Sequence, residues 1–380
     1  MSNSSLGCEW REALPLLVQR TAGQVPRLPQ VRRYRFGAAV VEVTTDYQPL
    51  IDELETFYGD CACDDAVLGA SRIGCSATLL TGTPLLWLSF DSIPARSPVD
   101  VALGMYRFCR RSPYIEQANP SHGWRAVTDT TEARRLIVAG SEKIALVNLD
   151  LAPPEFVLDC IVGNALAAQP DMLFLHAASV GIAGAGALIL APSFGGKSTV
   201  ALTLASRGHA FLGDDVGAIK LATRDLLPFP RSAGLRDGPL EAKLRARLQT
   251  CRHARAPARD GALRTVVRVS ELFPRSVSGP LPLRFAFLLD GITDRAKITP
   301  FQPRQKELRR LRNMVVLDAA PVWGRSPGRD LMQLLGVMSL LSGLRCYLLE
   351  TGSIEDAAGL IEHAMTATPA EPPALVEMQT

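Results

Sequence analysis

The segment ALILAPSFGGKSTVALTLASRGHAFLGDD, residues 187–215, decides the fold of the second half of the chain. Its first apolar residues, 188–190, are typical of a buried strand, and a loop with two adjacent glycines follows. The next apolar residues recur at helical spacing as far as Gly208, which we expect to stop the helix. Residues 210–212 then form a short return strand. Strand, loop, helix and strand in this order predict an α/β core.

The loop at 191–198, Ala-Pro-Ser-Phe-Gly-Gly-Lys-Ser, has the order of a phosphate-binding P-loop, or Walker A motif. Backbone N–H groups of such a loop converge on phosphate oxygens, and the helix dipole also favours negative charge there. We expect Lys197 to reach the β- and γ-phosphates of ATP and the Ser198 hydroxyl to bind Mg²⁺. Ala191 replaces the first glycine of the usual motif. The alternative is a Gly-Gly-Lys-Ser turn that only begins an ordinary helix.

Two adjacent carboxylates, Asp214 and Asp215, follow the return strand at its carboxyl end. Sheets of α/β proteins place their ligand sites at this end. Beside Mg²⁺ and ATP, one carboxylate can bind the metal while the other accepts the proton of an acceptor hydroxyl. The alternative is a Gly-Asp-Asp turn that only ends a strand.

His176, the P-loop and the acidic pair together resemble the catalytic domain of HPr kinase/phosphorylase. That family carries a histidine at a fixed distance before the P-loop, and His176 lies at that distance from Ala191. The family's phosphate-binding helix ends in Arg-Gly-His and leads to an Asp-Asp pair, and here 207–209 and 214–215 match both features. The resemblance is specific over 173–216 and looser over the rest of the second domain.

The sequence is most similar to the HPr-kinase-related kinases of bacteria, including those that act on natural-product peptides. The resemblance implies an α/β P-loop kinase domain of the HPr kinase/phosphoenolpyruvate carboxykinase type. It implies an ATP- and Mg²⁺-dependent phosphotransferase whose acceptor is a hydroxyl, expected to be a serine of a protein or peptide. Asp215 would be the proton acceptor, Asp214 its partner and, with Ser198, a metal ligand, and His176 would support the acid pair. A buried structural histidine is the alternative for His176.

The sequence also departs from the family. The Leu-Glu-Ile-Arg-Gly segment, whose glutamate helps to hold magnesium, has no match after Asp215, and the stiff turn at 228–231 stands in its place. We hypothesise that Arg231 contacts a phosphate or an acidic substrate, because a planar guanidinium suits that task. A surface arginine in a proline turn is the alternative. The residues expected to bind the nucleotide are Ser193, Phe194, Gly195, Gly196, Lys197, Ser198, Thr199 and Arg231.

The length of 380 residues predicts two domains. We expect an N-terminal α+β domain of unknown role over 1–155, the P-loop catalytic domain over 156–366 and a disordered tail over 367–380. His122, Asp64 and Asp65 have no partners at a telling spacing in the first domain. Further expected elements are strands at 40–43, 85–90, 143–149, 173–180, 187–191 and 345–349, helices at 48–58, 155–168 and 328–341 and after Ser353, and a flexible loop at 252–262.

The composition excludes several classes of protein. Lys plus Arg is 41 and Asp plus Glu is 38, so the net charge of +3 is too balanced for an obligate nucleic-acid binder. Eight scattered cysteines without a secretory signal predict free thiols and a cytoplasmic location. The uncharged stretch 172–196 is divided by glycines, so we expect buried strands and no membrane span. The basic stretches 243–259 and 304–312 are interpreted as solvated faces.

Two other functions stay open at this point. One is a regulatory protein that binds ATP and transfers nothing, which the replaced glycine and the missing glutamate would favour. The other is a kinase of a small molecule such as free serine or a sugar. The acceptor, the assembly state (including a homo-oligomer) and the role of the N-terminal domain also stay open.

Overall fold

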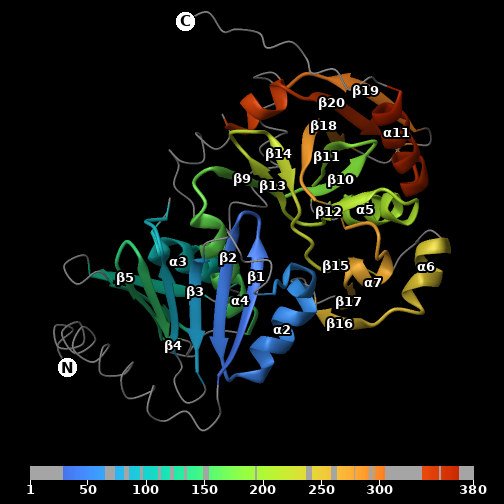
Figure 1. Cartoon of the computed structure of the whole chain (residues 1–380). Coiled ribbons are helices and arrows are strands. Elements are labelled where there is room, and N and C mark those ends of the chain that lie inside the picture. Colours follow the sequence, from blue (N-terminus) through green and yellow to red (C-terminus); the bar gives the residue numbers. More distant parts are fainter. Residues whose placement is uncertain are drawn as a thin grey trace, which may run out of the picture. The chain divides into compact units, whose positions relative to one another are not determined.

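The computed structural model of the chain divides into two units (Figure 1). Among the described residues, the first unit holds those up to Glu55 together with Ala62–Pro170, and the second holds Thr56–Cys61 and those from Asp171 onward. The described residues are 29–64, 73–80, 85–94, 97–109, 113–119, 124–131, 135–148, 154–192, 195–236, 242–257, 263–277, 279–290, 293, 296–303, 336–350 and 352–367.

The first unit is built on an eight-stranded sheet in the order β1-β2-β3-β4-β8-β7-β6-β5. Neighbouring strands are antiparallel, except that β2 and β3 are parallel. The strands are β1 (Gln30–Phe36), β2 (Ala39–Thr45), β3 (Ile73–Leu79), β4 (Leu85–Phe90), β5 (Tyr114–Asn119), β6 (Trp124–Asp129), β7 (Arg135–Gly140) and β8 (Ile144–Asn148). The helices are α2 (Gln48–Tyr58), α3 (Pro98–Cys109) and α4 (Pro154–Ala167). The last three residues of α2 and the short 3-10 helix η1 (Gly59–Cys61) that follows it belong to the second unit.

The sequence predicts the helix at 48–58 and the strand at 85–90 with their observed bounds. In β4, alternate residues face the core, so that Leu86 and Leu88 are fully buried while their neighbours are half-buried. Helices α3 and α4 pack against each other and against the sheet. The alternation of buried and half-buried residues in β4 is typical of a strand with one well-covered face.

Gln169, just after α4, joins that helix to the β1–β2 hairpin. Its buried side-chain oxygen accepts hydrogen bonds from the backbone N–H groups of Ala38 (2.9 Å) and Ala39 (3.1 Å). Its side-chain nitrogen donates to the carbonyls of Phe36 and Ala165, both at 2.9 Å. One amide therefore satisfies four backbone groups that the packing removes from water.

The observed boundary between the two units differs from the expected one. We expected the second domain to begin at residue 156, which would give it the helix at 155–168. The structure assigns α4 to the first unit, and the second unit resumes at Asp171. The uniform apolarity of the helix does not show which sheet it covers, so composition alone could not place it.

The second unit is built on a nine-stranded sheet. Its strands follow the order β12-β10-β11-β18-β14-β13-β9, and β20 pairs with both β18 and β19. Strand β18 runs parallel to β11 and β20, and the other neighbours are antiparallel. The strands are β9 (Met172–Leu175), β10 (Ala178–Ile182), β11 (Ala185–Leu190), β12 (Ala210–Gly213), β13 (Gly217–Lys220), β14 (Asp225–Leu227), β18 (Leu281–Leu289), β19 (Lys297–Phe301) and β20 (Arg345–Glu350).

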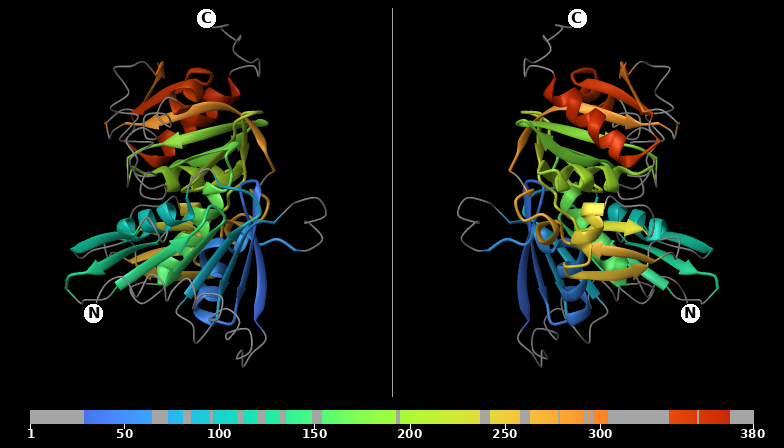
Figure 2. Two further views of the ribbon diagram at one scale, coloured as in Figure 1. Left: turned by 90° about the vertical axis from the view of Figure 1, so that its left-hand side faces the viewer. Right: turned by 90° about the vertical axis from the view of Figure 1, so that its right-hand side faces the viewer.

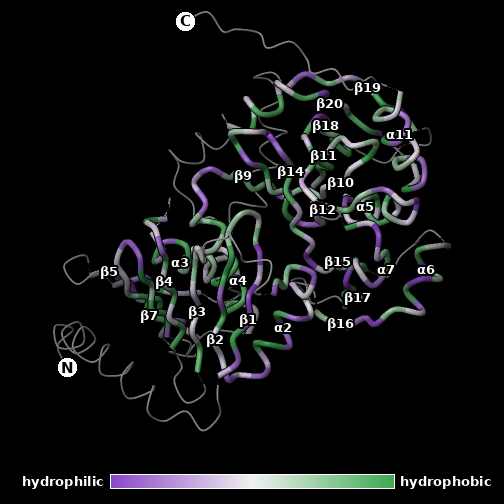
Figure 3. The backbone as a smooth tube through the Cα atoms, viewed as in Figure 1, coloured by the Kyte–Doolittle hydropathy of each residue, from purple (hydrophilic) through white to green (hydrophobic). Residues whose placement is uncertain are grey.

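Helices cover both faces of this sheet. Helices α5 (Lys197–Ser206) and α11 (Ile354–Thr366) lie side by side on one face (Figures 1 and 2). The helical residues 336–342 pack on the other face. Alternate residues of β11 therefore enter two separate cores, which explains why the strand reads as a continuous apolar run. Green marks the hydrophobic residues of these strands in Figure 3.

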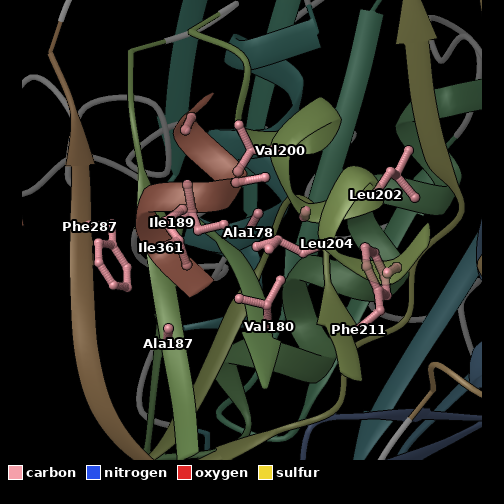
Figure 4. Packing of buried hydrophobic residues seen from close by; sticks show 14 of the residues in the cluster. Ala178, Val180, Ala187, Ile189, Val200, Leu202, Leu204, Phe211, Phe287 and Ile361 are labelled. Atoms are coloured by element: carbon pink, nitrogen blue, oxygen red, sulfur yellow. The ribbon is translucent and has the colours of Figure 1, made fainter. Parts of the chain in front are cut away.

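The core between the sheet and α5 is tightly specified. Val200 and Leu204 of α5 lie in one buried cluster with Val180, Ile189 and, from α11, Ile361 (Figure 4). Every residue of α5 from Val200 to its end is buried, because the strands lie on one side and α11 on the other. Packing on both sides therefore fixes α5 against the sheet.

The expected strand at 173–180 is wrong in one respect that matters for the site. It is two strands: β9 pairs with β13, whereas β10 pairs with β11 and β12. His176 lies at the break between them. A continuous apolar run hides such a break, since both strands are buried and share the same composition.

A small sheet in the order β15-β17-β16 completes the unit. It consists of β15 (Ala233–Arg236), β17 (Leu263–Val267) and β16 (His253–Pro257), with α6 (Ala242–Leu248) and α7 (Val269–Leu272) beside it in the chain. The expectation of a flexible loop at 252–262 is thus wrong for 253–257, which pair along their whole length with β17. Backbone pairing outweighs the weak strand propensity of alternating Ala and Arg.

Other expectations have simple outcomes. The strand at 345–349 and the helix capped by Ser353 are confirmed, since the Ser353 hydroxyl accepts the Asp356 N–H at 3.0 Å. None of the helices in the described residues is long and apolar enough to cross a membrane. The cysteines whose sulfur is described are free thiols, namely Cys61, Cys63, Cys75, Cys160, Cys251 and Cys346. Outside the described residues lie His122, Asp65, the stretch 304–312, the first part of the helix expected at 328–341 and the tail beyond Ala367.

Replacing Gln169 by Ala should destabilise the protein by about 2 to 4 kcal/mol, because buried backbone groups would lose their partners. Urea denaturation measures the change. The matched control is Gln249→Ala, which removes an exposed side chain of the second unit and should change stability by less than about 0.5 kcal/mol. Equal effects of the two substitutions would show that the Gln169 amide does not hold the hairpin.

Candidate functional site

The segment with the Gly-Gly-Lys-Ser sequence lies between β11 and α5. Gly196 precedes the helix with φ of 85°, the left-handed region that favours glycine, and no side chain caps the helix start by a hydrogen bond. The N–H of Gly195 donates to the carbonyl of Pro192 at 2.9 Å. A Cβ on Gly195 would come within 2.7 Å of the Ala191 Cβ, so the loop needs glycine at 195. Ser193 and Phe194, two of the expected nucleotide-binding residues, lie outside the described residues.

Lys197, the first residue of α5, turns its side chain back toward the loop. Its Nζ donates to the carbonyl oxygens of Ala191 (2.9 Å) and Pro192 (3.3 Å), and the residue is buried. Two carbonyl acceptors keep a buried ammonium group hydrogen-bonded. The positive charge of Lys197 also reaches Asp215, whose pKa it helps to lower.

A short turn brings Arg231 to the acidic pair. The N–H of Phe229 donates to the carbonyl of Leu212, the last residue before the Gly-Asp-Asp segment, at 2.6 Å. The N–H of Arg231 then donates to the carbonyl of Phe229 at 2.8 Å. These bonds hold the proline turn beside the end of β12, and the Arg231 side chain points at Asp215.

The Asp215 carboxylate lies between the side chains of His176 and Arg231. His176 Nδ1 is 3.1 Å from Oδ1, and Arg231 Nη1 donates to Oδ2 at 2.5 Å. The same His176 nitrogen is 3.2 Å from the Asp215 carbonyl oxygen. Burial acts to raise the pKa of Asp215, but the hydrogen bond and charge of His176 and the charges of Arg231 and Lys197 outweigh it and hold the pKa well below its usual range. Asp215 is therefore ionised at neutral pH.

Asp214 has the opposite environment. Only 6% of the residue is exposed, and burial, with the adjacent charge of Asp215, raises its pKa to about 6. A hydrogen bond from the Ser198 side chain, the charge of Arg231 and a backbone hydrogen bond from Gly234 act in the other direction. Its Oδ1 atom is buried and has no hydrogen-bond partner among the described residues. Burying this oxygen without a partner costs free energy that a bound cation would recover.

Asp214 and Ser198 therefore fit the demands of a magnesium ion. Mg²⁺ prefers oxygen ligands and is usually bound by one or two protein groups together with water and substrate phosphates. Within the described residues there is no group of three or more His, Cys, Asp or Glu side chains that could hold a metal by themselves.

The structure brings together most of the residues that the sequence points to. Hydrogen bonds and charge interactions connect His176, Lys197, Ser198, Asp214, Asp215 and Arg231. Arg231 is in contact with the acidic pair, and with a side chain 20% exposed it is not the surface arginine of the alternative reading. No phosphate contact follows from this pairing, so the hypothesised role toward a phosphate stays a proposal. Thr199 is half-buried in the first turn of α5.

Sequence reasoning missed two residues of this site. Arg231 Cζ lies 5.5 Å from the ring centroids of both Phe57 and Tyr58, at the end of α2. The apolar spacing of 48–58 predicts Phe57 as a core residue, and nothing in that spacing shows that its partner is a cation. A contact this far apart in sequence leaves no local signal.

Replacing Asp214 by Asn should stabilise the metal-free protein by about 1 to 3 kcal/mol at pH 8. The pKa of Asp214 is about 6 in the folded protein against an ordinary 3.8, so stability is lost as the pH rises through this window and the carboxyl ionises. The gain from Asn should be large above pH 7 and should shrink toward pH 4. Urea denaturation in the presence of a chelator at pH 8 and pH 4.5 measures it, with the exposed Asp171→Asn as the control. A gain that does not depend on pH would contradict the assignment.

Comparison with known proteins gives likeness to solved structures alone. No protein-family model matches the chain, and no curated protein matches it. Among the solved structures that align with it is the HPr(Ser) kinase/phosphatase from Coxiella burnetii. The alignment covers 52% of this chain and 99% of that chain, at 14% sequence identity and a TM-score of 0.26.

Proposed function

We propose that the chain is an ATP- and Mg²⁺-dependent phosphotransferase that phosphorylates a hydroxyl group, with a serine of a protein or peptide as the acceptor. The observation that carries the proposal is the Asp215 carboxylate, fixed between His176 and Arg231 in reach of the charge of the P-loop Lys197. Charged groups at these positions meet the requirements of phosphoryl transfer, which depends on positioning and on stabilising charge more than on covalent chemistry.

The start of α5 would bind the phosphates. Gly196 lies at the N-terminal end of the helix, where anions are favoured and where no side chain caps the helix, whereas the N–H of Gly195 already donates to the Pro192 carbonyl. Lys197 would exchange its bonds to the Ala191 and Pro192 carbonyls for bonds to phosphate oxygens. Thr199, Ser193 and Phe194 stay proposed members of this set by their place in the motif.

Ser198 and Asp214 would hold the magnesium ion, which neutralises charge on the transferring phosphoryl group when bound. The Ser198 side chain interacts with the Asp214 carboxyl and acts to lower its pKa. With a cation bound, the Asp214 carboxyl would ionise fully, since the ion offsets both its burial and the neighbouring charge of Asp215.

Asp215 would accept the proton of the acceptor hydroxyl. The attacking oxygen bonds to the γ-phosphorus, the bond from that phosphorus to the leaving ADP oxygen breaks, and the proton passes to the carboxylate. Because His176 and Arg231 keep Asp215 ionised, the carboxylate is ready to accept a hydrogen bond before transfer starts. His176 contacts both the carboxylate and the carbonyl of Asp215, so it would fix the turn as well as the charge.

Asp215→Asn should lower phosphate transfer by about 10²- to 10⁴-fold while ATP affinity stays within about threefold of that of the original protein. Lys197→Ala should weaken ATP binding itself, because the P-loop ammonium is then missing. Transfer is measured with Mg²⁺ and γ-labelled ATP in a desalted and an undesalted extract of the protein's own cells, and binding with a fluorescent ATP analogue. Asp171→Asn is the control for loss of an exposed carboxylate. Transfer by Asp215→Asn at the original rate would overturn the role of this residue.

A nucleotide-binding regulator is the second candidate, and one observation favours it. Both carboxylate oxygens of Asp215 already have partners, so an acceptor hydroxyl would have to share or displace one of them. Tight ATP binding without label transfer in either extract would support the regulator. Label only in the small molecules of the undesalted extract would identify a metabolite kinase.

A further inference from the structure

The end of α2 is tied to the second unit by hydrogen bonds. The N–H of Ser232 donates to the carbonyl of Phe57 at 2.8 Å. The Asp60 carboxylate accepts the N–H of Ser270 at 3.0 Å and the Ser270 hydroxyl at 2.5 Å. Residues 56–61 therefore belong to the same compact unit as the candidate site, although they lie far from it in sequence.

Two aromatic rings in this segment pack on Arg231. The guanidinium carbon lies 5.5 Å from each ring centroid of Phe57 and Tyr58, within the range of a cation–π interaction. Both residues are buried, at 8% and 3% exposure. The Tyr58 ring also packs edge-on against Phe229, with centroids 6.3 Å apart and planes at 89°. The rings therefore hold Arg231 and the turn that carries it.

The two rings affect Asp215 through Arg231, which contacts both the rings and the carboxylate. An arginine side chain has many rotamers, and ordering it costs conformational entropy. Stacking on two fixed rings removes much of that freedom before the ion pair forms. The Arg231 Nη1 atom then meets Oδ2 of Asp215 at 2.5 Å while the His176 nitrogen contacts Oδ1. The direction of the carboxylate is thus set from both sides.

We propose that Phe57 and Tyr58 are positioning residues of the site: their rings fix the Arg231 guanidinium against Asp215, and Arg231 in turn fixes the direction of that carboxylate toward the acceptor. The inference deepens the proposed phosphotransferase and rests on it for its catalytic part. It gives the end of α2 a role in positioning Arg231, which the apolar spacing of that helix does not predict.

The test removes the rings one at a time. Phe57→Leu and Tyr58→Leu keep an apolar side chain, Tyr58→Phe keeps the ring, and Phe287→Leu is the control for loss of a buried ring elsewhere in the unit. The first readout is the Nε–Hε NMR resonance of Arg231, assigned by its absence in Arg231→Lys. Ring currents should shift this resonance in the original protein, in Tyr58→Phe and in Phe287→Leu, and the shift should fall in the two ring-removing variants.

The second readout is phosphate transfer. Each ring-removing variant should lower kcat by about 10- to 100-fold while the Kd for ATP changes by less than about threefold, as expected when a catalytic group is misplaced but the P-loop is intact. Tyr58→Phe should keep kcat within about threefold. Arg231→Lys, which keeps the charge but loses the planar fork, should reproduce the loss of kcat even if a Leu variant does not fold.

The outcomes separate this inference from the proposed function. An Arg231 resonance that is unchanged in Phe57→Leu and Tyr58→Leu overturns the inference whatever the activity. An unchanged kcat in these variants of an active protein overturns it as well. If the original protein transfers no phosphate to any acceptor, the proposed function fails first, and the catalytic part of the inference fails with it. A lost ring-current shift together with a lower kcat and an unchanged ATP affinity supports both.

Discussion

The contact of the Asp215 carboxylate with Arg231 on one side and His176 on the other is the interaction on which the rest of the site depends. A carboxylate pair at the end of a strand would repel itself, and burial would favour protonating both members. His176 and Arg231 lower the pKa of Asp215, so this carboxylate stays charged. Burial and the neighbouring charge of Asp215 raise the pKa of Asp214 instead. Two chemically identical side chains thus acquire different properties from position alone. His176 lies at the break between β9 and β10, and Arg231 lies in the turn after β14.

Much of this arrangement could be predicted from the sequence, because it is encoded locally. Strand β11, helix α5 and strand β12 lie within one short segment, where apolar spacing and turn residues indicate structure directly. The position of Asp214 and Asp215 at the carboxyl end of β12 could likewise be predicted. Sequence reasoning failed where pairing partners decide the outcome. The division of the run around His176, the strand at 253–257 and the assignment of α4 to the first unit all depend on which distant strand or helix lies beside them.

The aromatic contacts of Arg231 illustrate the same limit at the level of single side chains. Phe57 has the spacing of a core residue and is in fact buried, so the prediction of its burial is correct and its partner is missed. A guanidinium is accepted against an apolar surface because its planar face is weakly hydrated and stacks well on rings. A residue that completes a polar site can therefore look in sequence like any other member of a hydrophobic face.

The contact between Ala191 and the backbone at Gly195 has a consequence for how this loop can change over time. The usual motif places its first glycine at the position of Ala191, and the methyl group there now occupies the space into which any side chain at 195 would have to grow. The two positions are therefore sterically coupled, because a glycine at 191 would remove the contact at 2.7 Å, while the Pro192 carbonyl oxygen would still lie 3.0 Å from a Cβ at 195. A larger side chain at 191 and any side chain at 195 thus compete for the same space.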